Sequence, residues 1–216
     1  DKENQTYAIE IIRGETAIQS NPERGTMRGA TVECIYCDVA TERERILEQG
    51  KTGKIGQQLL VVVLYHKGNV GRDFRAASKA DLAAFTQAKE RLNALKVEGY
   101  EFWGLERFLN VCPDEPTPHE RSRATAIQKY GITQWAHLFN DRQLLTILTL
   151  GKSIRVAAEL LAIENGENGQ VIALYLSILV SRYISRSSTL TVWDPSRNTI
   201  SSLFARRDIQ ITWDYS

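Results

Sequence analysis

The sequence predicts an α+β fold, with a β-rich N-terminal part followed by a helical hairpin and short C-terminal strands. Near the start of the chain apolar residues alternate with polar ones, and further along there is a continuous aliphatic run with β-branched residues. Both patterns indicate strands. Two long segments in the second half carry apolar residues at helical spacing, which indicates helices.

Composition and charge restrict the class of protein. Among 216 residues, 43% are hydrophobic and 25% are charged, as in an ordinary globular protein. The 27 basic and 26 acidic residues leave a formal charge of +1, so any site for a polyanion must be a local patch. The longest apolar run, Val171 to Val180, is far shorter than the roughly 20 residues that span a bilayer. We therefore expect a cytoplasmic protein with no membrane partner.

Two strands are expected in the first third of the chain. Tyr7, Ile9 and Ile11 give the segment Thr6–Ile12 the period of a half-buried strand. The aliphatic run Leu59–His66 predicts a buried strand. Between them, the highly charged segment Thr41–Lys54 is expected to be solvated.

The first helix is expected over Lys79–Lys96, with its end near Gly99. Ser78 and Asp81 have the spacing of a capping box with Asp in place of Glu. The apolar residues that follow at helical intervals are Leu82, Phe85, Leu92 and Leu95.

A proline-rich stretch divides the chain. Three prolines in Val111–His119 forbid regular structure and predict an extended segment. We therefore expect a β-rich part with one amphipathic helix over 1–110, a linker over 111–120 and a helical part over 121–216.

The helical part is expected to form a hairpin. Thr133 could cap a short helix over Gln134–Phe139. Asn140, with Gln143 at the box position, predicts a longer helix over Asp141–Ile163 whose apolar stripe is Leu144, Ile147, Leu148, Ile154, Ala158 and Leu161.

The polar break Glu164–Gly169 predicts a tight connection to a second helix. That helix, Gln170–Ser185, is apolar nearly all round, so we expect it at the centre of the core. Strand-like composition then returns in Thr189–Trp193 and Ile209–Trp213.

Cys34 and Cys37 have the spacing of a zinc knuckle, in which two thiolates on a turn bind one tetrahedral ion. A structural site needs four ligands, and Cys112 with one of the three histidines, His66, His119 or His137, could complete it. The alternative is that both are reduced cysteines on a loop. A redox pair is less favoured, because no helix signal follows Cys37 directly.

Basic residues gather locally, and such groups could neutralise phosphates, although a solvated helix face explains each cluster equally well. The clusters are Arg121, Arg123 and Lys129; Arg142, Lys152 and Arg155; and Arg182, Arg186, Arg197, Arg206 and Arg207. No nucleophile elbow, metalloprotease spacing or phosphate loop after a strand is present, so the sequence offers no catalytic residue of its own.

Three stretches of the chain, Gly25–Cys37, Tyr130–Leu150 and Leu203–Tyr215, together resemble the middle region of the large bacterial and archaeal adenine-specific DNA methylases that contain a zinc ribbon. The second stretch is the most specific. In that family the middle region lies between an upstream motif for S-adenosylmethionine and a downstream Asp-Pro-Pro-Tyr catalytic motif. This chain contains neither, since Asp194-Pro195 is followed by Ser196.

The resemblance implies a non-catalytic target-recognition segment, excised from a DNA adenine methyltransferase and binding DNA together with the remainder of its parent. S-adenosylmethionine would be a cofactor of the parent and not of this segment. Cys34 and Cys37 would be half of a zinc ribbon, and we expect them to hold no zinc here, because the family's first cysteine pair would precede Asp1. Asp38 stands where the family usually has Gly.

The target base of such an enzyme is buried in paired DNA and must be extruded, which requires contacts to the backbone. Within the most family-like stretch, we expect Arg142, Lys152 and Arg155 to contact phosphates from one helix face. Arg206 and Arg207 are further candidates.

Two other functions remain open. The chain could be a stand-alone adaptor that binds nucleic acid or protein without enzymatic activity, or a redox or metal sensor acting through Cys34 and Cys37. Weak binding of S-adenosylmethionine would favour the methylase segment. Exposed apolar faces that normally meet a catalytic domain could also drive formation of a homodimer.

Overall fold

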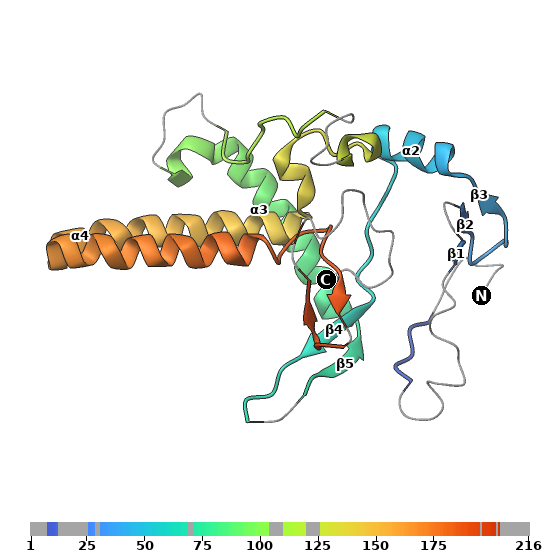
Figure 1. Ribbon diagram of the computed structural model, residues 1–216, viewed down its shortest axis with the longest axis horizontal. Helices are drawn as coiled ribbons and strands as arrows, with labels where there is room; N and C mark the ends of the chain where they lie inside the picture. The colour runs from blue at the N-terminus through green and yellow to red at the C-terminus, as the bar shows by residue number, and fades with distance from the viewer. Residues whose placement is uncertain are drawn as a thin grey trace.

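The computed structural model confirms the α+β class. It describes residues 8–12, 26–28, 31–68, 71–103, 110–119, 126–194, 196–201 and 203. A helical hairpin extends from one side of a central body, and a small three-stranded sheet lies on the opposite side (Figure 1). None of the described helices is long and apolar enough to cross a membrane.

The small sheet contains three antiparallel strands, β1 (Met27–Arg28), β2 (Thr31–Glu33) and β3 (Ala40–Thr41), in that order. Helix α2 (Arg43–Lys51) follows directly. This helix was not predicted, because its charged segment contains only two large apolar residues, Ile46 and Leu47. The predicted strand Thr6–Ile12 is wrong in its described part, since residues 8–12 have no regular structure.

Helix α2 is held by a close backbone contact. Gly50 is buried, and a Cβ atom on it would lie 2.6 Å from the carbonyl oxygen of Tyr130 in the 3-10 helix η1 (Ile127–Tyr130). Gly131 follows η1 with a φ of 85°, and a Cβ atom there would collide with the backbone of Gly50. Two glycines therefore let the end of α2 approach η1 at a distance that no other residue permits.

The aliphatic run forms an antiparallel hairpin of β4 (Val61–Leu64) and β5 (Asp73–Ala76). The prediction of a strand is confirmed, but the strand is not fully buried: Val63 is 38% exposed and the neighbouring Tyr65 is 66% exposed. The shorter hairpin β6 (Trp193–Asp194) and β7 (Thr199–Ile200) packs beside it, with the rings of Phe74 and Trp193 edge to face at 5.9 Å.

Both predicted capping boxes are confirmed. The backbone N–H of Ser78 donates to Asp81 Oδ2 at 2.8 Å, and that of Asp81 donates to Ser78 Oγ at 3.3 Å. Helix α3 (Lys79–Trp103) begins there and continues past the predicted end near Gly99. Asn140 and Gln143 exchange the same pair of bonds, at 2.9 and 3.0 Å, at the start of α4 (Asp141–Ile184).

Before α4 lies the 3-10 helix η2 (Trp135–Leu138), shorter than predicted. Its N-cap is Gln134, which makes no side-chain capping bond, so the prediction that Thr133 caps this helix is wrong. The side-chain hydroxyl of Thr133 instead lies 3.5 Å from Nδ1 of His137.

The core joins the two halves of the chain. Leu92 of α3 packs with Val111, Leu144 and Leu148, so α3 lies on the first arm of α4. A second cluster contains Ile127, Ile132 and Leu138. The proline-rich segment is extended, as predicted, and is also packed: Thr117 is 3% exposed and its hydroxyl donates to the carbonyl oxygen of Ile132 at 2.7 Å.

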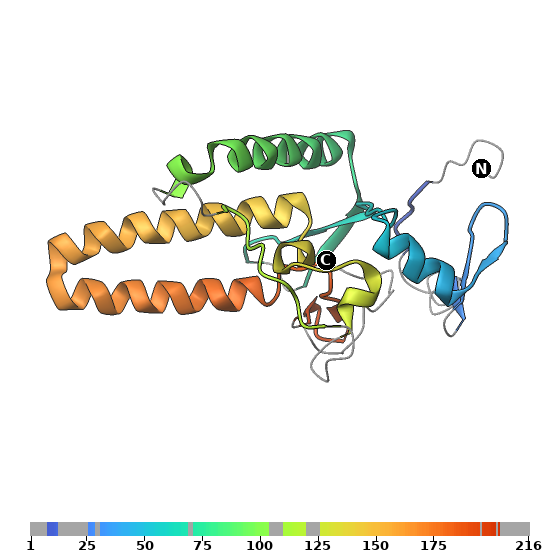
Figure 2. The same cartoon turned by 90° about the horizontal axis from the view of Figure 1, so that it is seen from above.

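Helix α4 folds back on itself as the predicted hairpin (Figure 2). Gly166, with φ 53° and ψ −126°, breaks the helix. Gly169 then brings the backbone of the second arm against Leu161 of the first. Figure 2 shows α3, the first arm and the second arm in that order, so the second arm is at the edge.

The prediction that the second arm lies at the centre of the core is therefore wrong. Its inner residues Ala173, Leu176, Val180 and Ile184 are only partly buried, and several outer residues are 45–65% exposed. The predicted strand Thr189–Trp193 is also displaced: the strand that forms is Trp193–Asp194, preceded by Val192 in a single β-bridge. Ile209–Trp213 lies outside the described residues.

Candidate nucleic-acid interface

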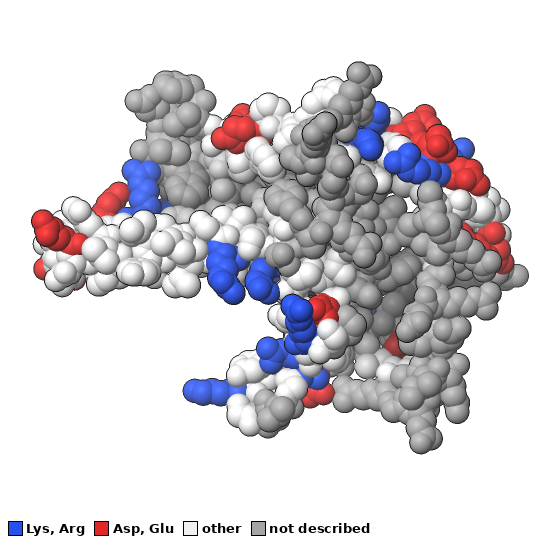
Figure 3. All heavy atoms as spheres, in the orientation of Figure 1, with Lys and Arg blue, Asp and Glu red and all other residues white. Residues whose placement is uncertain are grey.

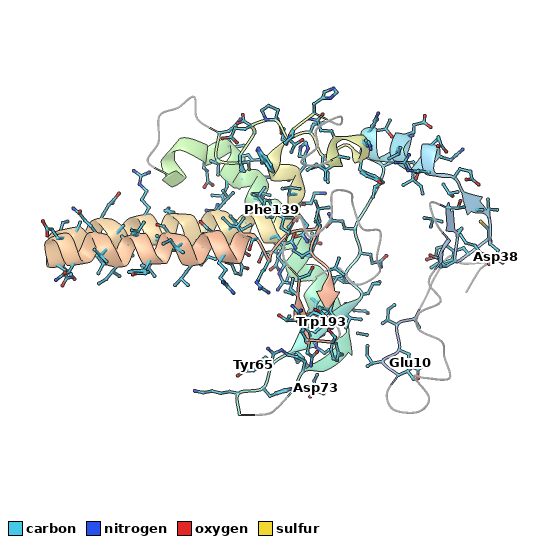
Figure 4. The ribbon with its side chains drawn as sticks, in the orientation of Figure 1. Glu10, Asp38, Tyr65, Asp73, Phe139 and Trp193 are labelled. Carbon is cyan, nitrogen blue, oxygen red and sulfur yellow. The ribbon has the colours of Figure 1, made fainter. Side chains whose placement is uncertain are left out.

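Cys34 and Cys37 lie on a tight turn between β2 and β3. The turn is closed by two backbone bonds: Cys34 N–H donates to the carbonyl oxygen of Val39 at 3.0 Å, and Asp38 N–H donates to that of Cys34 at 2.9 Å. Asp38 adopts the left-handed conformation, with a φ of 59°, at the position where a glycine is favoured. Figure 4 shows Asp38 at the outer end of the molecule, far from the helical hairpin. The turn thus has the backbone form of a knuckle.

The same turn favours the thiolate form of Cys34. The backbone N–H groups of Tyr36 and then Cys37 hold the pKa of the Cys34 thiol below its usual value. In contrast, burial raises the pKa of the Cys112 thiol. A thiolate is the form that binds a metal ion.

The described residues do not form a complete zinc site. They contain no group of three or more Cys, His, Asp or Glu side chains that could hold a metal ion. Completion of the site by Cys112 and His66, His119 or His137 is therefore excluded in this arrangement. A zinc ion held by Cys34 and Cys37 would need two further ligands from another chain segment.

The basic residues predicted on α4 are not on one face. At about 100° per residue, Arg142 and Arg155 point some 140° apart around the helix axis, with Lys152 between them. Arg155 also pairs with Glu159 at 3.3 Å, in an exposed i,i+4 arrangement. Arg206 and Arg207 lie outside the described residues. These five residues therefore remain a prediction rather than a formed surface.

A different set of cations lies together. Figure 3 shows Lys and Arg side chains following one another from the lower edge of the helical hairpin, where α4 ends, to the β4–β5 hairpin. They border a recess between the two hairpins. We call this surface the basic face; the elements along it carry Lys67, Arg72, Arg186 and Arg197.

The β4–β5 hairpin forms the outer wall of the basic face. Lys67 and Arg72 flank its turn and are exposed. The guanidinium of Arg72 lies over the ring of Tyr65, 4.6 Å from the ring centroid. Figure 4 shows Tyr65 and Asp73 on the outer part of this hairpin. The tip therefore presents a cation and an exposed aromatic ring side by side.

The inner wall is fixed by hydrogen bonds. Arg186, just after α4, donates through Nη1 to the carbonyl oxygen of Ile200 in β7 at 2.7 Å. Arg197, whose side chain is 81% exposed, lies in the turn between β6 and β7, 3.7 Å from Asp194. The pKa of Asp194 is lowered mainly by the hydroxyl of Ser196, which donates to it at 2.6 Å. The end of α4 and the β6–β7 turn thus hold a set orientation.

Part of the basic face was predicted from the sequence. Arg186 and Arg197 belonged to one predicted cluster, but Lys67 and Arg72 were not singled out. A signal was present: both flank a Gly-containing segment between two strand-like runs, the composition of a β-hairpin turn. The distance along the chain between the hairpin and α4 concealed that they share a surface.

Fold and site together define an α+β protein with a local cationic recess and a Cys-x-x-Cys turn. Comparison with protein-family models, with curated proteins and with solved structures finds no match to this chain.

Proposed function

We propose that this chain binds duplex DNA through the basic face. The observation that carries the proposal is the gathering of Lys and Arg side chains along the basic face, around one recess, in a protein whose formal net charge is only +1. Phosphate contacts supply most of the sequence-independent affinity of DNA-binding proteins. A local cluster on a nearly neutral chain restricts such contacts to one side of the molecule.

Each part of the basic face has a role in this proposal. Lys67 and Arg72 reach out on a two-stranded ribbon, an element that fits the major groove of B-DNA. Arg186 and Arg197, on the braced inner wall, fix the orientation through phosphates. The ring of Tyr65, which is 66% exposed beneath Arg72, offers a stacking surface to an unpaired base.

The sequence resemblance supports a more specific form of the proposal, a target-recognition segment of an adenine-specific DNA methyltransferase. The knuckle turn at Cys34 and Cys37, with Asp38 at the glycine-like position, is consistent with half a zinc ribbon. In this form the parent protein supplies S-adenosylmethionine binding and the catalytic motif, and the segment contributes contacts to DNA. The coding frame tests it: continuation upstream into a cofactor motif and a further cysteine pair, and downstream into Asp-Pro-Pro-Tyr, supports it, whereas flanking stop codons refute it.

DNA binding by the segment is tested by fluorescence anisotropy with a labelled duplex over a range of KCl concentrations. Each phosphate contact contributes about −0.9 to the slope of log K against log salt. The double variant Lys67→Gln/Arg72→Gln should therefore bind more weakly, with a slope shallower by roughly 2.

The matched control is Arg43→Gln/Arg45→Gln, which removes the same charge from exposed positions on α2, away from the basic face. This control should retain the slope of the unmodified chain. Binding that does not weaken with salt, or an equal loss in the control and the test variant, would exclude the basic face as the DNA site.

A further inference from the structure

The second arm of α4 carries two apolar stripes. The inner stripe, Ala173, Leu176, Val180 and Ile184, is partly buried against the first arm. The outer stripe faces away from the first arm and comprises Val171, Ile172, Leu174, Tyr175, Ile178 and Leu179, each 45–65% exposed. Since the second arm lies at the edge of the helical layer, no described helix covers the outer stripe (Figure 2). A helix with apolar residues on both sides is usually covered by a packing partner on each side.

The outer stripe is large enough for a stable interface. Its exposed fractions correspond to on the order of 600 Å² of apolar surface, at the upper end of the largest patches on monomeric proteins. A standard interface buries about 800 Å² per partner, of which roughly 65% is apolar at its centre. The outer stripe alone therefore provides the apolar share of one such interface.

The charged residues at the two ends of the outer stripe indicate which partner it binds. No Asp, Glu, Lys or Arg occurs between Asn168 and Ser181, but Glu167 stands at one end of the outer stripe and Arg182 at the other. About four helical turns separate these two residues, which places them on the same side of the arm as the stripe. They are nearly equidistant from Tyr175. An identical arm that is packed antiparallel would place its Arg182 against this Glu167, and its Glu167 against this Arg182.

We propose that the outer stripe is a homodimer interface, in which the second arms of two copies pack antiparallel about Tyr175. The contact is isologous, because each residue of one copy meets its two-fold counterpart in the other. A parallel pairing would bring like charges together at both ends. The apolar stripe supplies the affinity, and the two charge pairs select the antiparallel direction.

Sedimentation equilibrium of the full chain, without nucleic acid, tests the dimer. The unmodified chain should show a concentration-dependent dimer that persists in high salt, since the contact is mainly apolar. Ile178→Lys places two unpaired charges inside the interface and should raise the dissociation constant by about 100-fold or more. Because Ile178 is 54% exposed, this variant should keep the helical content of the unmodified chain, which circular dichroism checks. The control Val97→Lys, at an 86% exposed position on α3, should leave the dimer unchanged.

A charge exchange tests the direction of packing. Glu167→Arg and Arg182→Glu should each weaken the dimer, and the double exchange Glu167→Arg/Arg182→Glu should restore it. A chain that is monomeric at every concentration, or an Ile178→Lys variant that still dimerises, overturns the proposal and leaves the stripe to a different protein. A dimer that the double exchange fails to restore overturns the antiparallel arrangement. Neither result depends on DNA binding.

Discussion

Replacement of Gly50 by alanine tests the joint between α2 and η1, because two physical effects oppose each other there. In a helix, alanine is favoured over glycine by up to about 1 kcal/mol. If α2 were a solvated helix, Gly50→Ala would stabilise the protein. In the structure, however, the added Cβ atom would lie 2.6 Å from the carbonyl oxygen and 2.9 Å from the Cα atom of Tyr130.

A collision with backbone cannot be relieved by rotation of a side chain. Overpacking of this kind costs about 1–3 kcal/mol. With the gain in helix propensity subtracted, Gly50→Ala should lower the free energy of unfolding by up to about 2 kcal/mol. For a chain of this size, each 1 kcal/mol corresponds to about 2–4 °C in Tm.

Thermal and urea unfolding, followed by circular dichroism, would measure the effect. Gly56→Ala is the matched control: nothing lies within 4 Å of the added Cβ atom, so the substitution should be neutral or stabilise by about 0.4–1 kcal/mol through the unfolded chain. The two variants should therefore shift Tm in opposite directions. If Gly50→Ala raised Tm as Gly56→Ala does, α2 would not be docked on η1.

Three further predictions concern stability. Asn140→Ala removes the cap of α4 and should lower the free energy of unfolding by about 1 kcal/mol in urea titrations, whereas Asn140→Asp should retain most of it. Hydrogen bonds from Arg75 and then Ser78 hold the pKa of Asp81 well below its usual range. The stability that this carboxylate contributes is therefore present above about pH 4 and is lost as the pH falls further. In Asp81→Asn, the free energy of unfolding should fall less steeply with decreasing pH in this acid range. Leu92→Ala, at a 1% exposed position, should cost about 2–5 kcal/mol, and Leu82→Ala, at a 46% exposed position on the same helix, should cost much less; equal losses would contradict the packing of α3 on α4.

The helix starts and the hairpin turn were predicted correctly, because each depends on residues that are close together in the sequence. The capping boxes at Ser78 and Asn140 were read from residue spacing alone, and both form the expected bonds. The polar break before Gly169 was likewise sufficient to predict the hairpin, because glycine supplies the positive φ at Gly166. Such features depend on residues only a few positions apart.

Structural features that depend on contacts between residues far apart in the sequence could not be predicted from local patterns. Helix α2 has only a short apolar side, Ile46 and Leu47, and a contact with Tyr130, far along the chain, holds it in place. The second arm of α4 has the composition of a core helix, and composition does not tell which of its sides meets a neighbour. Similarly, the basic face combines the turn near Lys67 with the end of α4, so no window of sequence contains it.

In the proposed dimer, the length of the second arm of α4 determines how far apart the two basic faces lie. From Tyr175 to Arg186 the chain rises about 16 Å, so two arms that pair antiparallel about Tyr175 would hold their two Arg186 residues on the order of 30 Å apart. One turn of B-DNA is about 34 Å. The paired hairpins would then fix the distance between the two basic faces of the dimer. The dimer should therefore bind duplexes with two target sites about 10 base pairs apart more tightly than duplexes whose sites are half a turn closer or farther.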